Sequence, residues 1–240
     1  MSPPIQAIFF DAAGTLFRVR GSVGEVYGRV AARHRPEIAA ADLDAAFREV
    51  FAASKPLRFP NLTGAHLHQI ETQWWYDVVY KVLGRFDVLL DFDEYRRDIY
   101  EVFRGAGGWE LYPETHDTLA ALRGRGYRMA VVSNFDSRLP DVLAALGIAE
   151  LFEDITFATA HGVAKPDPDL FRIPLQRLGL APEAVVHVGD HMDEDVVGSR
   201  AVGLRPILVS RDGRRLPSVD LQAIRTLDQL LTLLPERAGG

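Results

Sequence analysis

Short apolar runs alternate with segments of helical periodicity along most of this chain. The apolar runs, each bounded by turn residues, predict strands at residues 5–10, 127–132, 154–158, 184–188 and 205–209. Segments with apolar residues three and four positions apart predict amphipathic helices at residues 115–125, 140–146, 168–178, 195–202 and 221–234. Strands and helices in this alternating order are typical of an α/β protein with a parallel sheet.

The stretch between residues 18 and 109 has a different pattern. Helical periods predict helices at residues 23–34, 41–53, 67–83 and 93–103, and there is no convincing strand. The tract Gly105-Ala106-Gly107-Gly108 is a plausible hinge for the return to the sheet. The aromatic tract at residues 73–76 is typical of a packed core. We therefore predict a Rossmann-like parallel sheet core, residues 1–17 and 110–240, with an inserted helical domain, residues 18–109.

Composition and charge exclude several functional classes. The chain has 240 residues and no cysteine, which excludes disulfides, thiolate metal ligands and a cysteine nucleophile. A net charge of -6 with scattered arginines argues against a nucleic-acid partner. No apolar run reaches the ~20 residues of a membrane span and no signal peptide is recognisable, so a cytoplasmic location is the default expectation. A P-loop motif is also absent.

Polar side chains follow three of the predicted strands. Asp11 comes directly after the first strand, Ser133 and Asn134 follow the second, and Gly189-Asp190 follows the strand at residues 184–188. In open α/β sheets, ligands bind outside the carboxyl ends of the strands. We therefore expect these side chains to meet in one crevice.

Four segments in this order resemble the motifs of the haloacid dehalogenase-like hydrolase superfamily. They are Phe9-Phe10-Asp11-Ala12-Ala13-Gly14-Thr15-Leu16, Val132-Ser133-Asn134, Lys165-Pro166-Asp167-Pro168 and Gly189-Asp190-His191-Met192-Asp193-Glu194-Asp195. The resemblance covers the whole predicted sheet domain. It identifies the helical insert with the family's cap domain and is closest to the dehalogenase-like subgroup.

The resemblance implies a hydrolase that acts through a covalent intermediate on Asp11, because a carboxylate nucleophile divides one difficult displacement into two easier steps. Lys165 would supply positive charge beside this nucleophile. A Mg²⁺ ion would be held by Asp11, Asp190 and the backbone carbonyl of Ala13, and Asp195 would hold a metal-bound water or Lys165.

The same motifs imply a binding site for a small anionic substrate. Ser133 and the backbone amides of Ala12 and Ala13 would donate hydrogen bonds to substrate oxygens. We also assign Thr15 and Asn134 to substrate binding. The residues of the cap that select the substrate are not recognisable in the sequence.

Ala13 departs from the pattern of the family's phosphatases, which usually carry a second aspartate at this position. That aspartate protonates the leaving oxygen, and positioned acid–base catalysis contributes ~10²- to 10⁴-fold. Two branches of the family have no alkoxide to protonate. The 2-haloacid dehalogenases expel halide, and the phosphonoacetaldehyde hydrolases use a cap lysine, for which only Lys55 and Lys81 are available here.

The acidic fourth motif instead favours a Mg²⁺-dependent enzyme. We therefore expect phosphoryl transfer of weak or narrow activity, with a 2-haloacid dehalogenase as the first alternative. The second alternative is a catalytically impaired protein that binds a ligand or a partner in the crevice. A phosphonoacetaldehyde hydrolase-like activity is a minor alternative, because neither lysine of the insert lies in the expected local motif.

Overall fold

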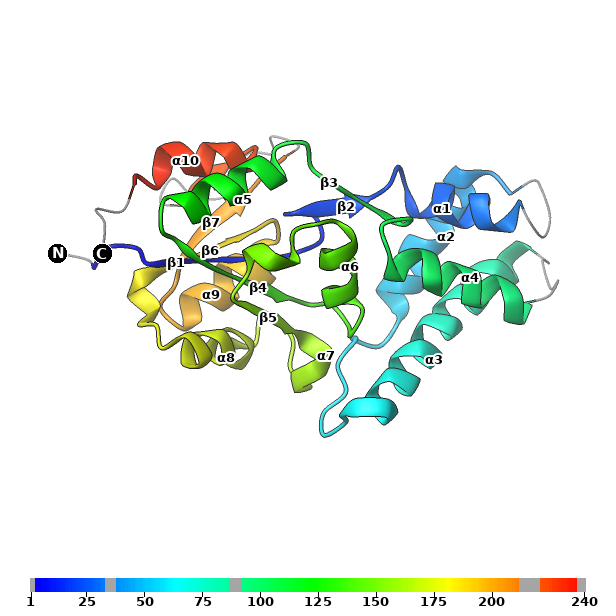
Figure 1. The fold of residues 1–240 in the computed structure, drawn as a ribbon. Coiled ribbons are helices and arrows are strands. Elements are labelled where there is room, and N and C mark those ends of the chain that lie inside the picture. Colours follow the sequence, from blue (N-terminus) through cyan, green and yellow to red (C-terminus); the bar gives the residue numbers. More distant parts are fainter. Residues whose placement is uncertain (1–2, 33–37, 87–91, 212–220, 237–240) are drawn as a thin grey trace.

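The computed structural model describes residues 3–32, 38–86, 92–211 and 221–236 (Figure 1). A six-stranded sheet has the order β5-β4-β1-β6-β7-β8, and every neighbouring pair in it is parallel. The strands are β1 (Ala7–Phe10), β4 (Arg128–Ser133), β5 (Asp154–Phe157), β6 (Val185–Gly189), β7 (Arg205–Val209) and β8 (Gln222–Ile224). The predicted α/β class with a Rossmann-like parallel sheet is confirmed.

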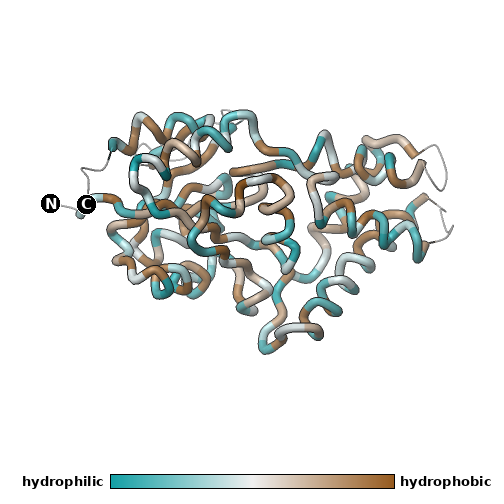
Figure 2. The backbone as a smooth tube through the Cα atoms, in the orientation of Figure 1, coloured by the Kyte–Doolittle hydropathy of each residue, from teal (hydrophilic) through white to brown (hydrophobic). Residues whose placement is uncertain are grey.

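Helices cover both faces of the sheet. α5 (Thr115–Gly124) and α10 (Leu230–Leu233) lie on one face, and α8 (Pro168–Leu178) and α9 (Gly198–Ala201) lie on the other (Figure 1). All four residues of β1 are fully buried between these layers. A central parallel strand is covered on both faces, so it is a continuous apolar run. The helices around the sheet differ from this strand, because hydrophobic and hydrophilic residues alternate along them (Figure 2).

A group of helices lies beside the sheet, between β2 and β3 in the sequence (Figure 1). These helices are α1 (Val23–Ala31), α2 (Ala40–Ala53), α3 (Gly64–Leu83) and α4 (Phe92–Arg104). They correspond to the helices that were predicted, although residues 33–37 lie outside the described residues. We propose that they form the cap, with the boundaries at residues 18 and 109.

Two short strands join these helices to the sheet domain. β2 (Phe17–Val19) and β3 (Trp109–Leu111) pair antiparallel at the proposed boundary. The Phe17 and Trp109 rings also pack edge to face with centroids 5.2 Å apart. The prediction of no strand in this region was wrong at its two ends, because strands of three residues are too short to show a period.

The predicted helix at residues 221–234 was also wrong. β8 occupies Gln222–Ile224 and pairs with β7, and only the short segments Leu227–Gln229 and Leu230–Leu233 are helical. A short apolar run fits a strand and a helix equally well, and here the free edge of β7 decided between them.

The predicted helix at residues 195–202 begins earlier than expected. Its first part is a π-helical segment, Met192–Val197, which continues into α9 and holds Asp193, Glu194 and Asp195 of the fourth motif. The remaining core helices are α6 (Leu139–Ala145) and α7 (Ala158–His161). Within the described ranges, no helix is both long enough and apolar enough to cross a membrane.

Candidate active site

The polar strand ends meet at one edge of the sheet. Asp11 follows β1, Ser133 is the last residue of β4, and Asp190 follows β6. β1 pairs with β4 on one side and with β6 on the other, so Asp11 lies at the point where the strand order reverses. This position is the usual ligand site of doubly wound sheets.

Lys165 connects two buried carboxylates. Its Nζ donates hydrogen bonds to Oδ1 of Asp11 and Oδ1 of Asp195, each at 2.6 Å. Ser133 Oγ donates a second hydrogen bond to Asp11 Oδ1 at 3.1 Å. All four side chains are buried, so the orientation of the Asp11 carboxylate is set by contacts with little competition from water.

Burial and charge act in opposite directions on this cluster. Burial raises the pKa of the Asp11 carboxyl, and the adjacent Lys165 opposes that shift. Burial alone would lower the pKa of Lys165, but the carboxylates of Asp11 and Asp195 raise it above its usual range. Burial would likewise raise the pKa of Asp195, yet Lys165 and His187 hold it well below its usual value. Lys165 and Asp195 are therefore an ion pair at neutral pH.

Asp190 completes a group of carboxylates that could hold a metal ion. Oxygen atoms of Asp11, Asp190 and Asp195 all lie within 4.8 Å of one another. Partial desolvation and the charges of Asp11 and Asp195 raise the pKa of Asp190 to about 6. Three carboxylates thus share the single ammonium group of Lys165 in this cluster. A set of oxygen donors with surplus negative charge fits a hard divalent cation such as Mg²⁺.

The loop after Asp11 is shaped to approach Asp190. Gly14 has a φ of +92°, and a Cβ atom at this position would overlap the Asp190 carboxylate. Glycine is therefore required both for the backbone angle and for the space. Thr15 is fully buried, and its Oγ1 lies 3.5 Å from Asp190 Oδ1. The structure thus places Thr15 against a candidate metal ligand.

Asn134 positions the loop that carries Lys165. Its Oδ1 accepts a hydrogen bond from the Lys165 backbone N–H at 2.7 Å, and its Nδ2 donates to the Lys165 carbonyl at 3.0 Å. Both polar ends of the Asn134 amide are used in this way. Its contact with the loop explains why an amide side chain is suited to the end of β4.

Ala12 and Ala13 lie on the same loop as Asp11. Ala12 is fully buried, whereas Ala13 is partly exposed and lines a cavity of about 290 Å³ between the sheet edge and helices α1–α4. None of the described residues that line this cavity is Asp, Glu or His. The lining therefore contains no carboxylic acid or imidazole, among its described residues, that could replace the aspartate expected at position 13 of a phosphatase.

The aromatic tract of α3 contacts the core beside this cavity. Trp75 Nε1 donates to Asp136 Oδ2 at 2.5 Å, and Glu71, which is fully buried, accepts hydrogen bonds from the backbone and hydroxyl of Ser137. Asp136 is also paired with Arg138, whose Nε and a terminal nitrogen donate to its two oxygens at 2.9 and 2.7 Å. The tract thus has an interface role as well as the predicted packing role.

Two residues of the site were missed in the sequence. His187 in β6 is fully buried, and its Nε2 lies 2.9 Å from Asp195 Oδ1. Arg211 donates to the backbone carbonyls of Gly14 and Thr15, at 3.3 and 2.7 Å, and so supports the loop that follows Asp11. A polar residue inside an apolar strand was a signal for His187, and proximity to the end of β7 was a signal for Arg211.

Comparisons with known proteins give relatives that cover most of the chain. A family model of haloacid dehalogenase-like hydrolases matches residues 5–203. A Danio rerio protein named haloacid dehalogenase-like hydrolase domain-containing protein 3 is 33% identical over 237 residues, 96% of each chain. A phosphoserine phosphatase of Thermus thermophilus is 37% identical over 123 residues, 49% of this chain and 48% of that protein.

A solved structure has the same architecture. The crystal structure of a 2-haloacid dehalogenase from Pseudomonas syringae pv. Tomato is 26% identical, covers 96% of this chain and 98% of its own, and has a TM-score of 0.62. The range matched by the family model contains the four motifs around Asp11, Ser133, Lys165 and Asp190. The chain belongs to the haloacid dehalogenase-like hydrolases.

Proposed function

We propose that this hydrolase transfers a phosphoryl group from a small anionic substrate to Asp11 in a Mg²⁺-dependent reaction. The observation that supports it is the cluster of Asp11, Asp190 and Asp195 around Lys165, with carboxylate oxygens within 4.8 Å. A cluster with surplus negative charge would repel an anionic substrate unless a cation is bound. A dehalogenase that attacks carbon has no need of such a metal site.

In the proposed reaction, Asp11 Oδ2 attacks phosphorus. We assign this oxygen because Lys165 and Ser133 both donate to Oδ1. The bond from phosphorus to the leaving oxygen breaks, and an aspartyl phosphate remains on Asp11. Water then attacks this phosphorus, which releases inorganic phosphate and restores the carboxylate.

The neighbouring residues orient the reactants and balance charge. Lys165 keeps its ammonium proton beside the free Asp11 carboxylate, because Asp11 and Asp195 raise its pKa despite burial. It therefore provides fixed positive charge beside the phosphoryl group. A Mg²⁺ ion held by Asp11, Asp190 and the Ala13 carbonyl would supply further charge stabilisation. Ser133 and the backbone amides of Ala12 and Ala13 are the proposed donors to the phosphoryl oxygens.

Ala13 limits which phosphate esters can react. An alkyl ester releases a basic alkoxide, and an acid normally protonates it for a gain of ~10²- to 10⁴-fold. Aryl and acyl phosphates release stable anions and lose little without that acid. The proposed activity is therefore a narrow one, directed at esters with good leaving groups.

Phosphate release from acetyl phosphate and p-nitrophenyl phosphate, with and without Mg²⁺, tests this function. We expect turnover that requires Mg²⁺ and disappears in Asp11→Asn, which keeps the shape of the side chain without its nucleophilic charge. Circular dichroism of the variant controls for folding. Activity of more than a few per cent in a freshly purified Asp11→Asn protein would refute the covalent mechanism.

A 2-haloacid dehalogenase is the second candidate, and Ala13 is the observation that favours it. Halide leaves without a proton, so the loss of the acid has no cost in that reaction. Chloride release from 2-chloropropionate in the presence of a metal chelator would establish this activity. Binding of phosphate or a phosphate ester without any turnover would instead support a ligand-binding protein.

A further inference from the structure

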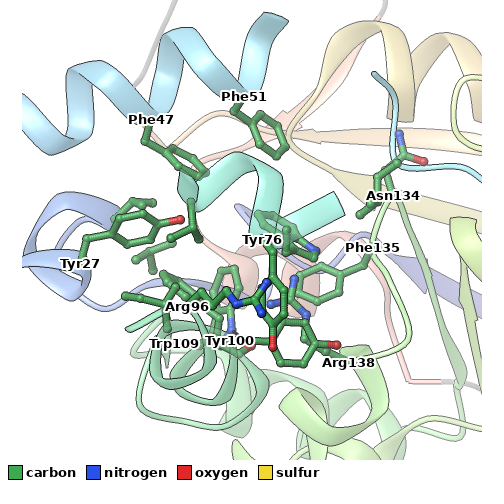
Figure 3. A pocket seen from close by; sticks show the side chains of 18 residues that line it. Tyr27, Phe47, Phe51, Tyr76, Arg96, Tyr100, Trp109, Asn134, Phe135 and Arg138 are labelled. Atoms are coloured by element: carbon green, nitrogen blue, oxygen red, sulfur yellow. Dashed lines mark hydrogen bonds between the residues drawn. The ribbon is translucent and has the colours of Figure 1, made fainter. Parts of the chain in front are cut away.

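Half of the residues that line the cavity beside Ala13 are aromatic. Phe47 and Phe51 of α2 face Tyr76 of α3 and Tyr100 of α4, and Phe135 and Asn134 lie on the side of the core (Figure 3). The exposed surface of the lining is almost entirely apolar, although Ala13 in this lining is only two residues from the charged side chain of Asp11. Such a mixture of an apolar chamber and a polar edge is typical of a ligand site.

The two arginines in the lining are already paired. Arg138 forms its ion pair with Asp136 at 2.7 Å, and Arg96 pairs with Asp93 at 2.8 Å. Their guanidinium groups also lie over aromatic rings, Arg138 at 4.5 Å from the Trp75 centroid and Arg96 at 4.2 Å from that of Tyr76. Each guanidinium group thus has a carboxylate partner, although Arg96 Nε is buried without a hydrogen-bond partner among the described residues. The lining therefore does not require a negatively charged group on the ligand.

The size of the cavity indicates how large the occupant is. Its volume is about 290 Å³, and it lies between the sheet edge and the four helices. Dry apolar cavities of roughly 150 Å³ bind benzene in other proteins. A cavity of about twice that volume accommodates two fused rings. Sugar or amino-acid groups are disfavoured, because the lining is almost entirely apolar. Among the described residues, Arg96 Nε and Tyr100 Oη are its buried side-chain atoms without a hydrogen-bond partner, too few to replace the water around several hydroxyl or charged groups.

Ala13 joins this cavity to the catalytic loop. It is two residues from Asp11 and lies in the lining, at the position where related phosphatases carry the acid that protonates the leaving group. A phenolic oxygen needs that proton far less than an alkoxide does. The missing acid and the aromatic lining thus point to the same kind of leaving group.

We infer that the substrate is a phosphate ester of an uncharged aromatic alcohol, whose rings occupy this cavity while the phosphoryl group faces Asp11. The inference rests on the proposed function and specifies its substrate class. It separates this chain from the phosphoserine phosphatase to which it is similar, because phosphoserine carries a charged alkyl leaving group. Phosphoserine is expected to be a poor substrate.

The test compares 1-naphthyl phosphate with acetyl phosphate in the presence of Mg²⁺. Both have leaving groups that need no acid, and only the first has rings. Burial of an aromatic group is favourable enough that the naphthyl ester should have a KM at least about tenfold below that for acetyl phosphate. Turnover of acetyl phosphate that depends on Asp11, with a KM equal to or below that for 1-naphthyl phosphate, would show that the substrate class is wrong. The proposed function would then still stand.

A matched pair of variants on α3 locates the rings. Val79 is buried in the cavity lining, whereas Ile70 is exposed on the same helix and outside that lining. Val79→Phe should raise the ratio of the KM for naphthyl phosphate to the KM for acetyl phosphate about tenfold. Ile70→Phe should leave that ratio unchanged. If overpacking prevents Val79→Phe from folding, Phe51→Ala serves instead, because Phe51 is 45% exposed and its loss is tolerated more easily.

An unchanged ratio in the folded cavity variant would overturn the inference. If the wild-type chain hydrolyses no phosphate ester, the proposed function fails, and calorimetry with 1-naphthol then decides about the cavity alone. Binding that weakens in Val79→Phe or Phe51→Ala and not in Ile70→Phe would support an aromatic site. No binding to the wild-type chain would overturn it.

Discussion

His187 Nε2 lies 2.9 Å from Oδ1 of Asp195, the same oxygen that accepts a hydrogen bond from Lys165. The carboxylate can only accept, so the imidazole must carry its proton on Nε2 and donate it. Among the described residues, His187 Nδ1 has no hydrogen-bond partner. His187 therefore donates through Nε2 and helps keep the Asp195 carboxylate beside Lys165.

Replacement of His187 separates this positioning role from simple packing. His187→Leu removes a buried hydrogen bond to a charged group, and we expect the free energy of unfolding to fall by roughly 1.5–3 kcal/mol. His187→Gln retains a nitrogen donor near the same place and should recover much of the loss. Urea denaturation measures both variants. Equal destabilisation by Leu and Gln would mean that packing against Phe171, and not the hydrogen bond, is the main contribution of His187.

Removal of Lys165 should leave two buried carboxylates without their cation. Breaking a buried ion pair in this way costs about 3–5 kcal/mol. We therefore expect Lys165→Met to be inactive and strongly destabilised in urea denaturation. The double variant Lys165→Met with Asp195→Asn removes one of the stranded charges and should be less destabilised than the single variant. If the double variant is less stable than Lys165→Met alone, repulsion between the carboxylates is unimportant.

Mg²⁺ should bind to the wild-type chain and not to Asp190→Asn. The physical reason is that Asp190 is the solvent-exposed member of the carboxylate group and offers an oxygen for the ion. A ligand that binds only the folded state also stabilises it, by about 2.7 kcal/mol at one hundred times its Kd. Calorimetry gives the affinity and a thermal melt gives the stabilisation. Equal affinity of both proteins would place the ion elsewhere.

The convergence of the polar strand ends was largely predictable from the geometry of parallel sheets. Parallel strands present their carboxyl ends at a common edge, so Asp11, Ser133 and Asp190 were expected to converge, and the structure brings them together. The two hydrogen bonds of Lys165, to Asp11 and Asp195, were harder to predict. The loop that carries Lys165 does not directly follow a strand, so only the motif indicated its place in the site.

Other features depend on contacts that a local pattern does not contain. β8 forms because β7 has a free edge, and the residues of β8 fit a helical period equally well. The hydrogen bond from Arg211 to the Thr15 carbonyl joins residues almost 200 positions apart. The cavity is lined by residues of four separate helices and of the sheet domain, so no single segment of the sequence predicts its aromatic lining.

The final prediction concerns the acid that is absent at Ala13. Its partly exposed methyl group lies in the lining of the cavity, on the loop that carries Asp11, so an aspartate here would place a carboxyl group near the leaving oxygen. Ala13→Asp should therefore increase the turnover of alkyl phosphates by up to ~10²- to 10⁴-fold, and that of aryl phosphates much less. The ratio of kcat/KM for glycerol phosphate to that for phenyl phosphate measures this difference.

Ala13→Asn is the control for this substitution, because it has nearly the same size and transfers no proton. Either side chain can overpack the loop at a cost of ~1 to 3 kcal/mol, so the thermal stability of both variants must be compared with that of the wild-type chain. If the ratio of kcat/KM for glycerol phosphate to that for phenyl phosphate rises in Ala13→Asp and not in Ala13→Asn, the missing acid limits the hydrolysis of alkyl phosphates. A folded Ala13→Asp protein with the wild-type ratio would show that Ala13 does not limit phosphatase chemistry, and the dehalogenase or ligand-binding alternatives would then be favoured.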